Sequence, residues 1–359
     1  MSVLITGGLG FIGSNVTKEL LNNNEDVIII DNLSNSLLVT YKNIKDITHK
    51  NFKLYSRDLL NKESLIQIFK ENQIESVINL AEPVFKNSLQ YYNDKLNMFL
   101  NLLEVMNNFN VKRLIQASSD IYNEEGNAKE IDKTIDLLDD KATIQQKTDK
   151  TIEGIISDFY RENNKENWSI NILRIFTTVG VDSNGLLGDI KINRDDIFSK
   201  ILRFYLKKEK VIISNNYMTY DNTKIRDYVH VSDVSNAIIK SLNYVRKSVN
   251  QINTFNISSG KPSSESTIVK LFETISNSKI NPDYIMLSKE KVSYRTGDKT
   301  LSHNILKYDN KFSIDIIIRN IIEYSHNYNQ IIKENADLEK QLLKQSNKKE
   351  IDDGTKPEE

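Results

Sequence analysis

Three glycines near the start of the sequence, Gly7, Gly10 and Gly13, have the spacing of a turn that binds the phosphates of a dinucleotide. They follow the apolar run "SVLIT" and precede a helical pattern. In that context the backbone N–H groups at the start of the helix can hold a pyrophosphate. The next apolar run ends at Asp31, and a carboxylate roughly 20 residues beyond the glycines accepts hydrogen bonds from ribose hydroxyls and repels a 2′-phosphate. The pattern therefore predicts NAD as the cofactor, rather than NADP.

Side chains for other kinds of reactive site are few. The sequence has no cysteine, which excludes disulfides, thiolate catalysis and thiolate metal sites. Its four histidines show none of the spacings of a zinc site, and they are His49, His230, His303 and His326. We therefore predict that the protein has no metal centre.

The balance of charges and the length of the apolar runs indicate which partners and which location to expect for the protein. With 48 basic and 49 acidic side chains, the sequence lacks the excess of Lys and Arg that binds nucleic acid or membrane phosphates. The first strand is expected to begin at Val3, which leaves no room for a cleaved signal, and no apolar run approaches the roughly 20 residues that span a bilayer. These features predict a soluble, cytoplasmic protein without nucleic-acid or membrane partners.

Short β-branched runs alternate with amphipathic stretches through the first half of the chain. The runs "SVLIT", "DVIII", "ESVINLA" and "RLIQAS" are separated by expected helices over 11–22, 62–71 and 91–108, and "SINILRIF" follows a further helix. This alternation is typical of βαβ units around a parallel sheet. The sequence therefore predicts an α/β fold with a Rossmann-type doubly wound parallel sheet over residues 1–178.

The second half is less regular and predicts a smaller lobe. We assign residues 179–328 to this lobe, with 226–245 returning to the sheet domain as a strand and a helix. Residues 329–359 form a tail, in which the 4-3-4-3 spacing of apolar and amide side chains from Ile331 to Gln345 fits either two coiled-coil heptads or, as we favour, a single surface helix. The charged end, "SNKKEIDDGTKPEE", is predicted to be disordered.

Several motifs occur together in one order along the chain. They are "TGGLGFIGSN", "DNLSNS", "RDLLN", "NLA", "SSDIY", "SNNYMTYDNTKIRDYVHVSD" and "YRTGD". In this order the sequence resembles the UDP-glucose 4-epimerase (UDP-galactose 4-epimerase) family of the extended short-chain dehydrogenase/reductase superfamily. The resemblance covers roughly residues 1–328. It implies an NAD-dependent isomerase of nucleotide-sugar metabolism, with residues 179–328 binding a UDP-sugar.

The resemblance also implies roles for individual residues. Asp58 and Leu59 would contact the adenine, and Ala81 would line the nicotinamide side. The full predicted cofactor set is Gly7, Gly10, Phe11, Ile12, Gly13, Asp31, Asn32, Asn35, Asp58, Leu59 and Ala81.

For the sugar nucleotide, Arg226 and Arg295 would hold the diphosphate, a role that suits the planar guanidinium fork. Thr177, Asp298 and Ser302 complete the predicted substrate set, and Ser302 stands where strict galactose epimerases tend to have a bulky aromatic residue, which would leave space for an N-acetylated sugar. The resemblance further implies a homodimer through the helices near 91–108 and 147–160.

The stretch "KATIQQKTDKTIEG", residues 141–154, departs from the family. Family members use a tyrosine to move the C4-hydroxyl proton and a lysine four residues later to lower its pKa, beside a Ser or Thr that orients the sugar. Ser118 matches the Ser or Thr, because it lies four residues before Tyr122. The positions of the pair hold Gln145 and Asp149. The Tyr-x-x-x-Lys spacings at 41–45 and 91–95 fall in other elements, and we interpret them as chance.

Other differences agree with a change in chemistry. Thr177 replaces an asparagine that contacts the substrate, and Val84 falls near a position where the family often has a lysine. We favour a UDP-hexose 4-epimerase-like protein with impaired or lost catalysis. The alternatives are an active epimerase with an unfamiliar base, such as water or Lys147, a structural or regulatory NAD-binding subunit, and a nucleotide-sugar dehydratase, which Asp120 suggests.

Overall fold

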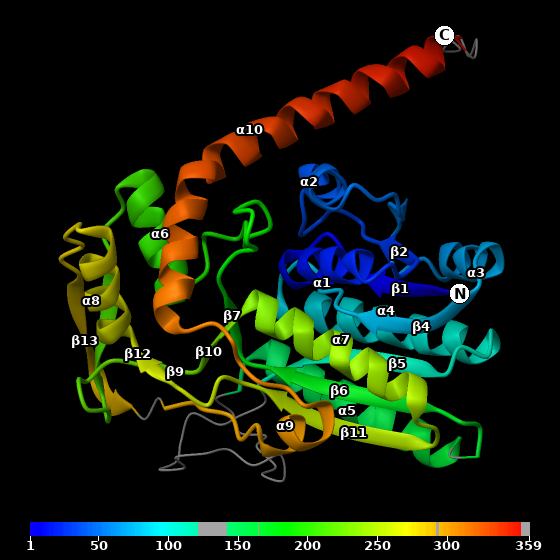
Figure 1. The fold of residues 1–359 in the computed structure, drawn as a ribbon, viewed down its shortest axis with the longest axis horizontal. Helices are drawn as coiled ribbons and strands as arrows, with labels where there is room; N and C mark the ends of the chain where they lie inside the picture. The colour runs from blue at the N-terminus through cyan, green and yellow to red at the C-terminus, as the bar shows by residue number, and fades with distance from the viewer. Residues whose placement is uncertain (121–141, 164, 292–293, 353–359) are drawn as a thin grey trace.

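The computed structural model describes residues 1–120, 142–163, 165–291 and 294–352, and at its centre lies a parallel sheet of seven strands (Figure 1). The strand order is β11-β6-β5-β4-β1-β2-β3, and every neighbouring pair is parallel. The bounds are β1 Ser2–Thr6, β2 Val27–Ile30, β3 Lys53–Tyr55, β4 Ile74–Asn79, β5 Arg113–Ser119, β6 Ser169–Ile175 and β11 Gln251–Ile257. The predicted Rossmann-type α/β fold is therefore confirmed.

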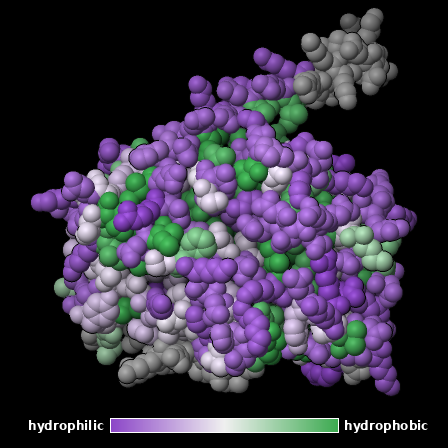
Figure 2. Space-filling model, in the orientation of Figure 1, coloured by the Kyte–Doolittle hydropathy of each residue, from purple (hydrophilic) through white to green (hydrophobic). Residues whose placement is uncertain are grey.

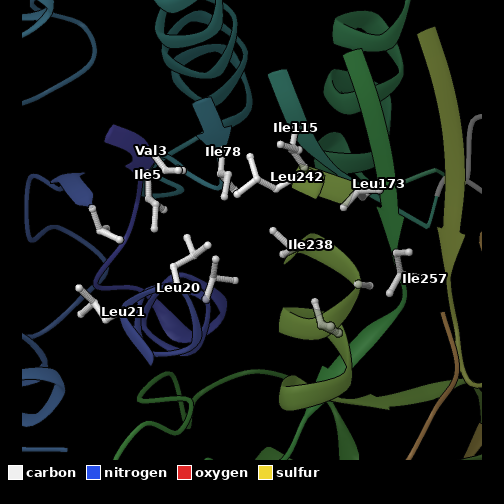
Figure 3. Close-up of a cluster of buried hydrophobic side chains, with 14 of the residues drawn as sticks. Val3, Ile5, Leu20, Leu21, Ile78, Ile115, Leu173, Ile238, Leu242 and Ile257 are labelled. Atoms are coloured by element: carbon white, nitrogen blue, oxygen red, sulfur yellow. The ribbon is translucent and has the colours of Figure 1, made fainter. Parts of the chain in front are cut away.

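Two hydrophobic cores form because the central strands are buried on both faces. Val3 and Ile5 of β1 contact the first core, whereas Leu4 between them contacts the second. Helices α1 (Phe11–Asn22) and α7 (Val231–Lys247) supply the first core, which Figure 3 shows. Helices α3 (Lys62–Glu71), α4 (Ser88–Asn108) and α5 (Ile144–Glu162) supply the second. Each fully buried aliphatic side chain contributes about 1.5–3 kcal/mol to this packing.

A second lobe with its own core covers one end of the sheet (Figure 1). Its strand pairs are β7 with β10, β8 with β13 and β9 with β12. Its elements are β7 Thr177–Val179, α6 Ile197–Lys207, β8 Ile212–Tyr217, β9 Ile225–Arg226, β10 Tyr228–His230, β12 Ser263–Ser264, α8 Glu265–Ser276 and β13 Asp283–Lys291. The short helix α9 (Thr300–Leu306) packs instead on β11 and α7.

The predicted segment 226–245 does not return to the central sheet as a strand, because β9 and β10 pair within the second lobe and only α7 packs on the sheet. After α7, strand β11 pairs with β6 and forms the edge of the sheet, although the sequence analysis assigned these residues to the second lobe. The strand reads "QINTFNI", and its first four residues are only half-buried. Because its half-buried positions hold polar residues, this strand lacks the continuous apolar run by which the other strands were predicted.

Helix α10 (Ile314–Asp352) is continuous from the second lobe to beyond the main body (Figure 1). Ile331 and Asn335 are buried, and the Oδ1 of Asn335 accepts a hydrogen bond of 3.1 Å from the backbone N–H of Val39 at the start of α2 (Leu38–Thr48). The first two residues of the 4-3-4-3 pattern, Ile331 and Asn335, therefore contact other parts of the same chain. The helix includes residues 346–352 of the segment predicted to be disordered, and residues 353–359 lie outside the described part.

The surface is mainly hydrophilic on the face that Figure 2 shows, with hydrophobic residues in small separate areas. None of the described helices combines the length and the apolar composition needed to cross a bilayer.

Candidate functional site

A cavity of about 580 Å³ lies at the carboxyl ends of β1, β2, β4 and β5, where open α/β sheets bind ligands. Side chains from the second lobe, including Thr177 and Arg194, form part of its wall. The predicted site residues that line it are Gly7, Gly10, Phe11, Ile12, Gly13, Asp31, Asn32, Asn35, Asp58, Leu59, Ala81, Ser118, Gln145, Asp149 and Thr177. All of the predicted cofactor residues therefore meet in one cavity.

The glycine turn fits a pyrophosphate because no side chain blocks its backbone. Gly7 has a φ of 66°, and a Cβ there would lie 2.9 Å from the Cα of Ala81. A Cβ on Gly13 would lie 2.1 Å from the carbonyl oxygen of Gly7. No side chain caps the start of α1 and no acidic residue lies in its first turn, so its N–H groups are suited to an anion.

Asp31 is held at the end of β2 by three hydrogen bonds. Its carboxylate accepts one from the backbone N–H of Leu9 (3.0 Å), one from the N–H of Leu33 (2.9 Å) and one from the hydroxyl of Ser36 (2.7 Å). The side chain still lines the cavity. Its remaining acceptor site suits a ribose hydroxyl, and its charge opposes a phosphate at that position.

Ser118 lies at the end of β5, and its hydroxyl is already engaged. The hydroxyl donates to Oε1 of Glu153 at 2.8 Å, and Glu153 binds the guanidinium of Arg174 through bonds of 3.0 and 2.6 Å. All three side chains are buried. The position of Ser118 is thus fixed from α5 and β6, whereas Tyr122, which gave the predicted spacing, lies outside the described residues.

Helix α5 presents an amide and a carboxylate to the cavity. The helix starts with a capping box between Thr143 and Gln146, which fixes its first turn. Gln145 and Asp149 line the cavity one turn apart, and Asp149 accepts a hydrogen bond of 3.0 Å from the backbone N–H of Ser119. Lys147 does not line the cavity. The geometry therefore gives no support to Lys147 as an unfamiliar base.

A lysine that the sequence patterns did not assign to the site reaches Asp149 from the neighbouring helix, α4. The Lys95 Nζ on α4 lies 2.5 Å from Oε1 of Glu82 and 3.7 Å from Oδ1 of Asp149. The hydroxyl of Tyr91 donates to the other oxygen of Glu82 at 2.8 Å. The Tyr91–Lys95 spacing, which we interpreted as chance, is therefore part of the site. The sequence did contain a signal for this contact, because Lys95 falls on the buried face of a predicted amphipathic helix, where a lysine needs a charged partner.

These contacts change the ionisation of the buried groups. Burial raises the pKa of Asp149 to about 6, although the ammonium of Lys95 acts in the opposite direction. Burial acts to lower the pKa of Lys95, but the carboxylates of Glu82 and Asp149 outweigh it and raise that pKa above its ordinary value. Lys95 is therefore protonated at neutral pH, and Asp149 is ionised above about pH 6.

The predicted substrate residues divide into two groups. Arg295 forms an ion pair of 3.3 Å with Asp120, which lines the cavity, while Arg226 adds a second positive charge near Asp120. Arg226, Arg295, Asp298 and Ser302 are not among the lining residues, whereas Thr177 is. Ser302 is fully buried and donates to the carbonyl oxygens of Asn256 and Lys299, so its contact with a sugar stays a prediction without support from the cavity.

Comparisons with known proteins agree with this geometry. Residues 3–258 match the NAD dependent epimerase/dehydratase family. The UDP-glucose 4-epimerase of Bacillus subtilis (strain 168) is 30% identical over 296 residues, which cover 78% of this chain and 84% of that protein. The UDP-glucose 4-epimerase of Haemophilus influenzae (strain ATCC 51907 / DSM 11121 / KW20 / Rd) is 33% identical over 310 residues, which cover 83% of this chain and 87% of that protein.

A solved structure extends the likeness to the whole architecture. The crystal structure of UDP-glucose 4-epimerase from Bifidobacterium longum in complex with NAD+ and UDP is similar with a TM-score of 0.81 and 25% identity. The similarity covers 91% of this chain and 98% of that chain. With the cavity, the glycine turn and the collinear relatives in agreement, the chain belongs to the UDP-glucose 4-epimerase family of NAD dependent epimerases and dehydratases.

Proposed function

We propose that the protein is an NAD-binding, UDP-hexose 4-epimerase-like protein in which catalysis is impaired or lost. The observation that carries this proposal is the pair of side chains that α5 presents to the cavity, Gln145 and Asp149. The cavity has the residues expected for the cofactor, but the position expected to hold a proton-transferring phenol holds an amide.

The residues of the cavity suggest how both ligands would be held. NAD, when bound, supplies a reversible hydride acceptor for the sugar carbon. The glycine turn would bind its pyrophosphate, and Asp31 would bind its adenosine ribose. Arg226 and Arg295 would bind the diphosphate of the UDP-sugar, while Ser118 and Thr177 would lie beside the sugar itself.

Proton transfer is the step that this cavity is poorly equipped to perform. The reaction must remove a proton from the C4 hydroxyl and return it later, near neutral pH. The amide of Gln145 cannot accept and return that proton. The carboxylate of Asp149, ionised above about pH 6, is able to accept a proton near neutral pH, but its negative charge opposes an alkoxide beside it. The hydroxyl of Ser118 donates to Glu153, and a neutral serine hydroxyl is by itself a weak base.

A coupled assay for conversion of UDP-galactose to UDP-glucose tests the proposal. Because a general acid–base group contributes about 10² to 10⁴ in rate, we expect turnover lower than that of an ordinary family member by a factor of about 10² or more. Binding of NAD and UDP should be retained in calorimetry. Ordinary turnover that Ser118→Ala abolishes, and that Gln145→Ala and Asp149→Ala leave unchanged, would contradict the proposal.

Two of the alternatives find less support in the contacts. Lys147 lies outside the cavity lining, and Asp120, which suggested a dehydratase, is paired with Arg295. A structural or regulatory NAD-binding subunit remains consistent with the proposed loss of catalysis. The cytoplasmic location stays a prediction of the sequence.

We also propose a homodimer, formed through α4 and α5. Leu89 and Leu100 on α4 are exposed by 80% and 43%, which leaves apolar surface on that helix. Leu100→Asp should convert the dimer into a monomer in light scattering, because it places a charge in the contact. Leu342→Asp on the distal part of α10, where Leu342 is 51% exposed, is the matched control and should stay dimeric. A monomeric unmodified protein would contradict this prediction.

A further inference from the structure

A cluster of three charged side chains lies beside the cavity and is not explained by proton transfer. It consists of Glu82, Lys95 and Asp149, from the loop after β4, from α4 and from α5, and we call it the charge cluster. The side chains of Lys95 and Asp149 are 5% and 2% exposed, and that of Glu82 is 34% exposed. With both carboxylates ionised, the cluster has one more negative than positive charge.

The carboxylates of the cluster, rather than its ammonium, face the cavity. Glu82 and Asp149 are lining residues, whereas Lys95 is not. Oδ1 of Asp149 is buried and has no hydrogen-bond partner among the described residues, and the Nζ of Lys95 lies 3.7 Å away. A buried carboxylate oxygen without a hydrogen bond is costly, and a positively charged ligand group in the cavity would offset that cost.

The place of the cluster corresponds to one end of a dinucleotide. Asp31 marks the adenosine end, and the glycine turn marks the pyrophosphate. The half of the cavity beyond the turn leads to the carboxyl ends of β4 and β5, where Ala81, Ser118 and the charge cluster lie. The nicotinamide half of a bound dinucleotide is therefore the half that would approach the cluster.

Most neighbouring charges pair with one another rather than with the cluster, and Arg226, whose positive charge acts on Asp120, is a further cation in this region. Asp120 pairs with Arg295, and Glu153 pairs with Arg174, so each of these pairs is neutral. Tyr91 is neutral, since burial raises the pKa of its hydroxyl far above the ordinary value. The other charged lining residues of the second lobe are Asp189, which pairs with Arg194, and the exposed Lys191.

We propose that the charge cluster makes the protein selective for the oxidised dinucleotide, NAD+, over the reduced form, NADH, so that the bound cofactor resists reduction. The nicotinamide ring of NAD+ carries a positive charge, which would disappear if the ring accepted a hydride from the C–H bond of a donor alcohol; the donor would become a ketone, and its hydroxyl proton would pass to water. A negative cluster in the largely buried wall of the cavity attracts the positively charged ring of NAD+ but not the neutral ring of NADH. This inference rests on the proposed NAD binding and gives a second reason for weak catalysis.

The ionisation of Asp149 supports a pH-dependent selectivity. Because burial raises its pKa to about 6, the carboxyl is mostly protonated at pH 5 and ionised at pH 8. The surplus negative charge is thus present at pH 8 and lost at pH 5. We expect the preference for NAD+ to be larger at pH 8.

The test compares the affinities of NAD+ and NADH by calorimetry, with the full-length protein and two isosteric variants. Asp149→Asn and Glu82→Gln should each lower the ratio Kd(NADH)/Kd(NAD+) by roughly tenfold at pH 8, as removal of one partly screened charge implies. Asp149→Asn should also abolish the change of the ratio between pH 5 and pH 8. Asp58→Asn, at the adenosine end, is the control and should change both affinities in parallel.

The outcomes separate this inference from the proposed function. An unchanged ratio in both variants, with thermal unfolding that shows an intact fold, overturns the inference. Should Asp149→Asn fail to fold, Glu82→Gln alone decides, because that side chain is partly exposed. Ordinary epimerase turnover together with the expected shift in ratio would overturn the proposed loss of catalysis and the contribution of the cluster to it, but not the selectivity for NAD+. Failure of the unmodified protein to bind either nucleotide overturns both.

Discussion

A triple variant, Gln145→Tyr with Asp149→Lys and Lys95→Gln, is expected to convert UDP-galactose to UDP-glucose about 10²-fold faster than the unmodified protein. The first two changes give α5 a phenol and, one turn later, an ammonium that lowers the pKa of the phenol. The capping box keeps the first turn of the helix in place, so both new side chains should face the cavity as Gln145 and Asp149 do.

The third change is required because Lys95 occupies the space that a lysine at 149 would enter. The Lys95 Nζ lies 3.7 Å from the carboxylate of Asp149, so the double variant without Lys95→Gln would bring two ammonium groups together in a buried place. Like charges there depress the pKa of both amines and destabilise the fold. We therefore expect the double variant to gain less than about tenfold in rate and to unfold at a lower temperature.

Two measurements decide this prediction. Lys95→Gln alone serves as the control and should give no gain in turnover. Equal rates for the double and triple variants would show that Lys95 does not oppose a lysine at 149. No gain in either, with NAD and UDP still bound, would assign the loss of activity to residues outside α5, and Thr177 is the first of these to test because it lines the cavity.

Gly13→Ala is expected to abolish measurable NAD binding and to lower the free energy of unfolding by on the order of 3 kcal/mol. The added Cβ would lie 2.1 Å from the carbonyl oxygen of Gly7 and 2.8 Å from the Cα of Gly8, and both are backbone atoms that cannot rotate away. The turn must therefore open, which moves the N–H groups that face the pyrophosphate. Calorimetry with NAD and denaturant unfolding measure the two effects.

Gly154→Ala is the matched control for this substitution. Gly154 lies in α5, and a Cβ there meets nothing within 4 Å. Alanine should stabilise the protein by about 0.5–1 kcal/mol, since it lowers the entropy cost of ordering a helical residue, and NAD binding should be unchanged. Loss of NAD binding in both variants, or in neither, would contradict the interpretation of the glycine turn.

The parts of the fold and of the site that could be predicted are those that depend on residues close together in the sequence. The alternation of apolar runs predicted the sheet, and the glycine spacing with Asp31 predicted one wall of the cavity, because both patterns arise within short segments. Strand β11 was missed because an edge strand is buried only in part and carries polar residues such as Asn253. Lys95 was missed for a different reason. Helices α4 and α5 pack against each other, and the sequence of one does not reveal which side chain of the other reaches its catalytic face.

The path of α10 has a consequence for how ligands enter and leave. The helix packs on α6 and α8 of the second lobe and then on α2 of the sheet domain, where Asn335 binds the backbone of Val39. It therefore connects the two lobes. We expect a rotation of one lobe against the other to break that hydrogen bond, so that the undocking of α10 from α2 would influence how fast ligands exchange, although no residue of α10 lines the cavity.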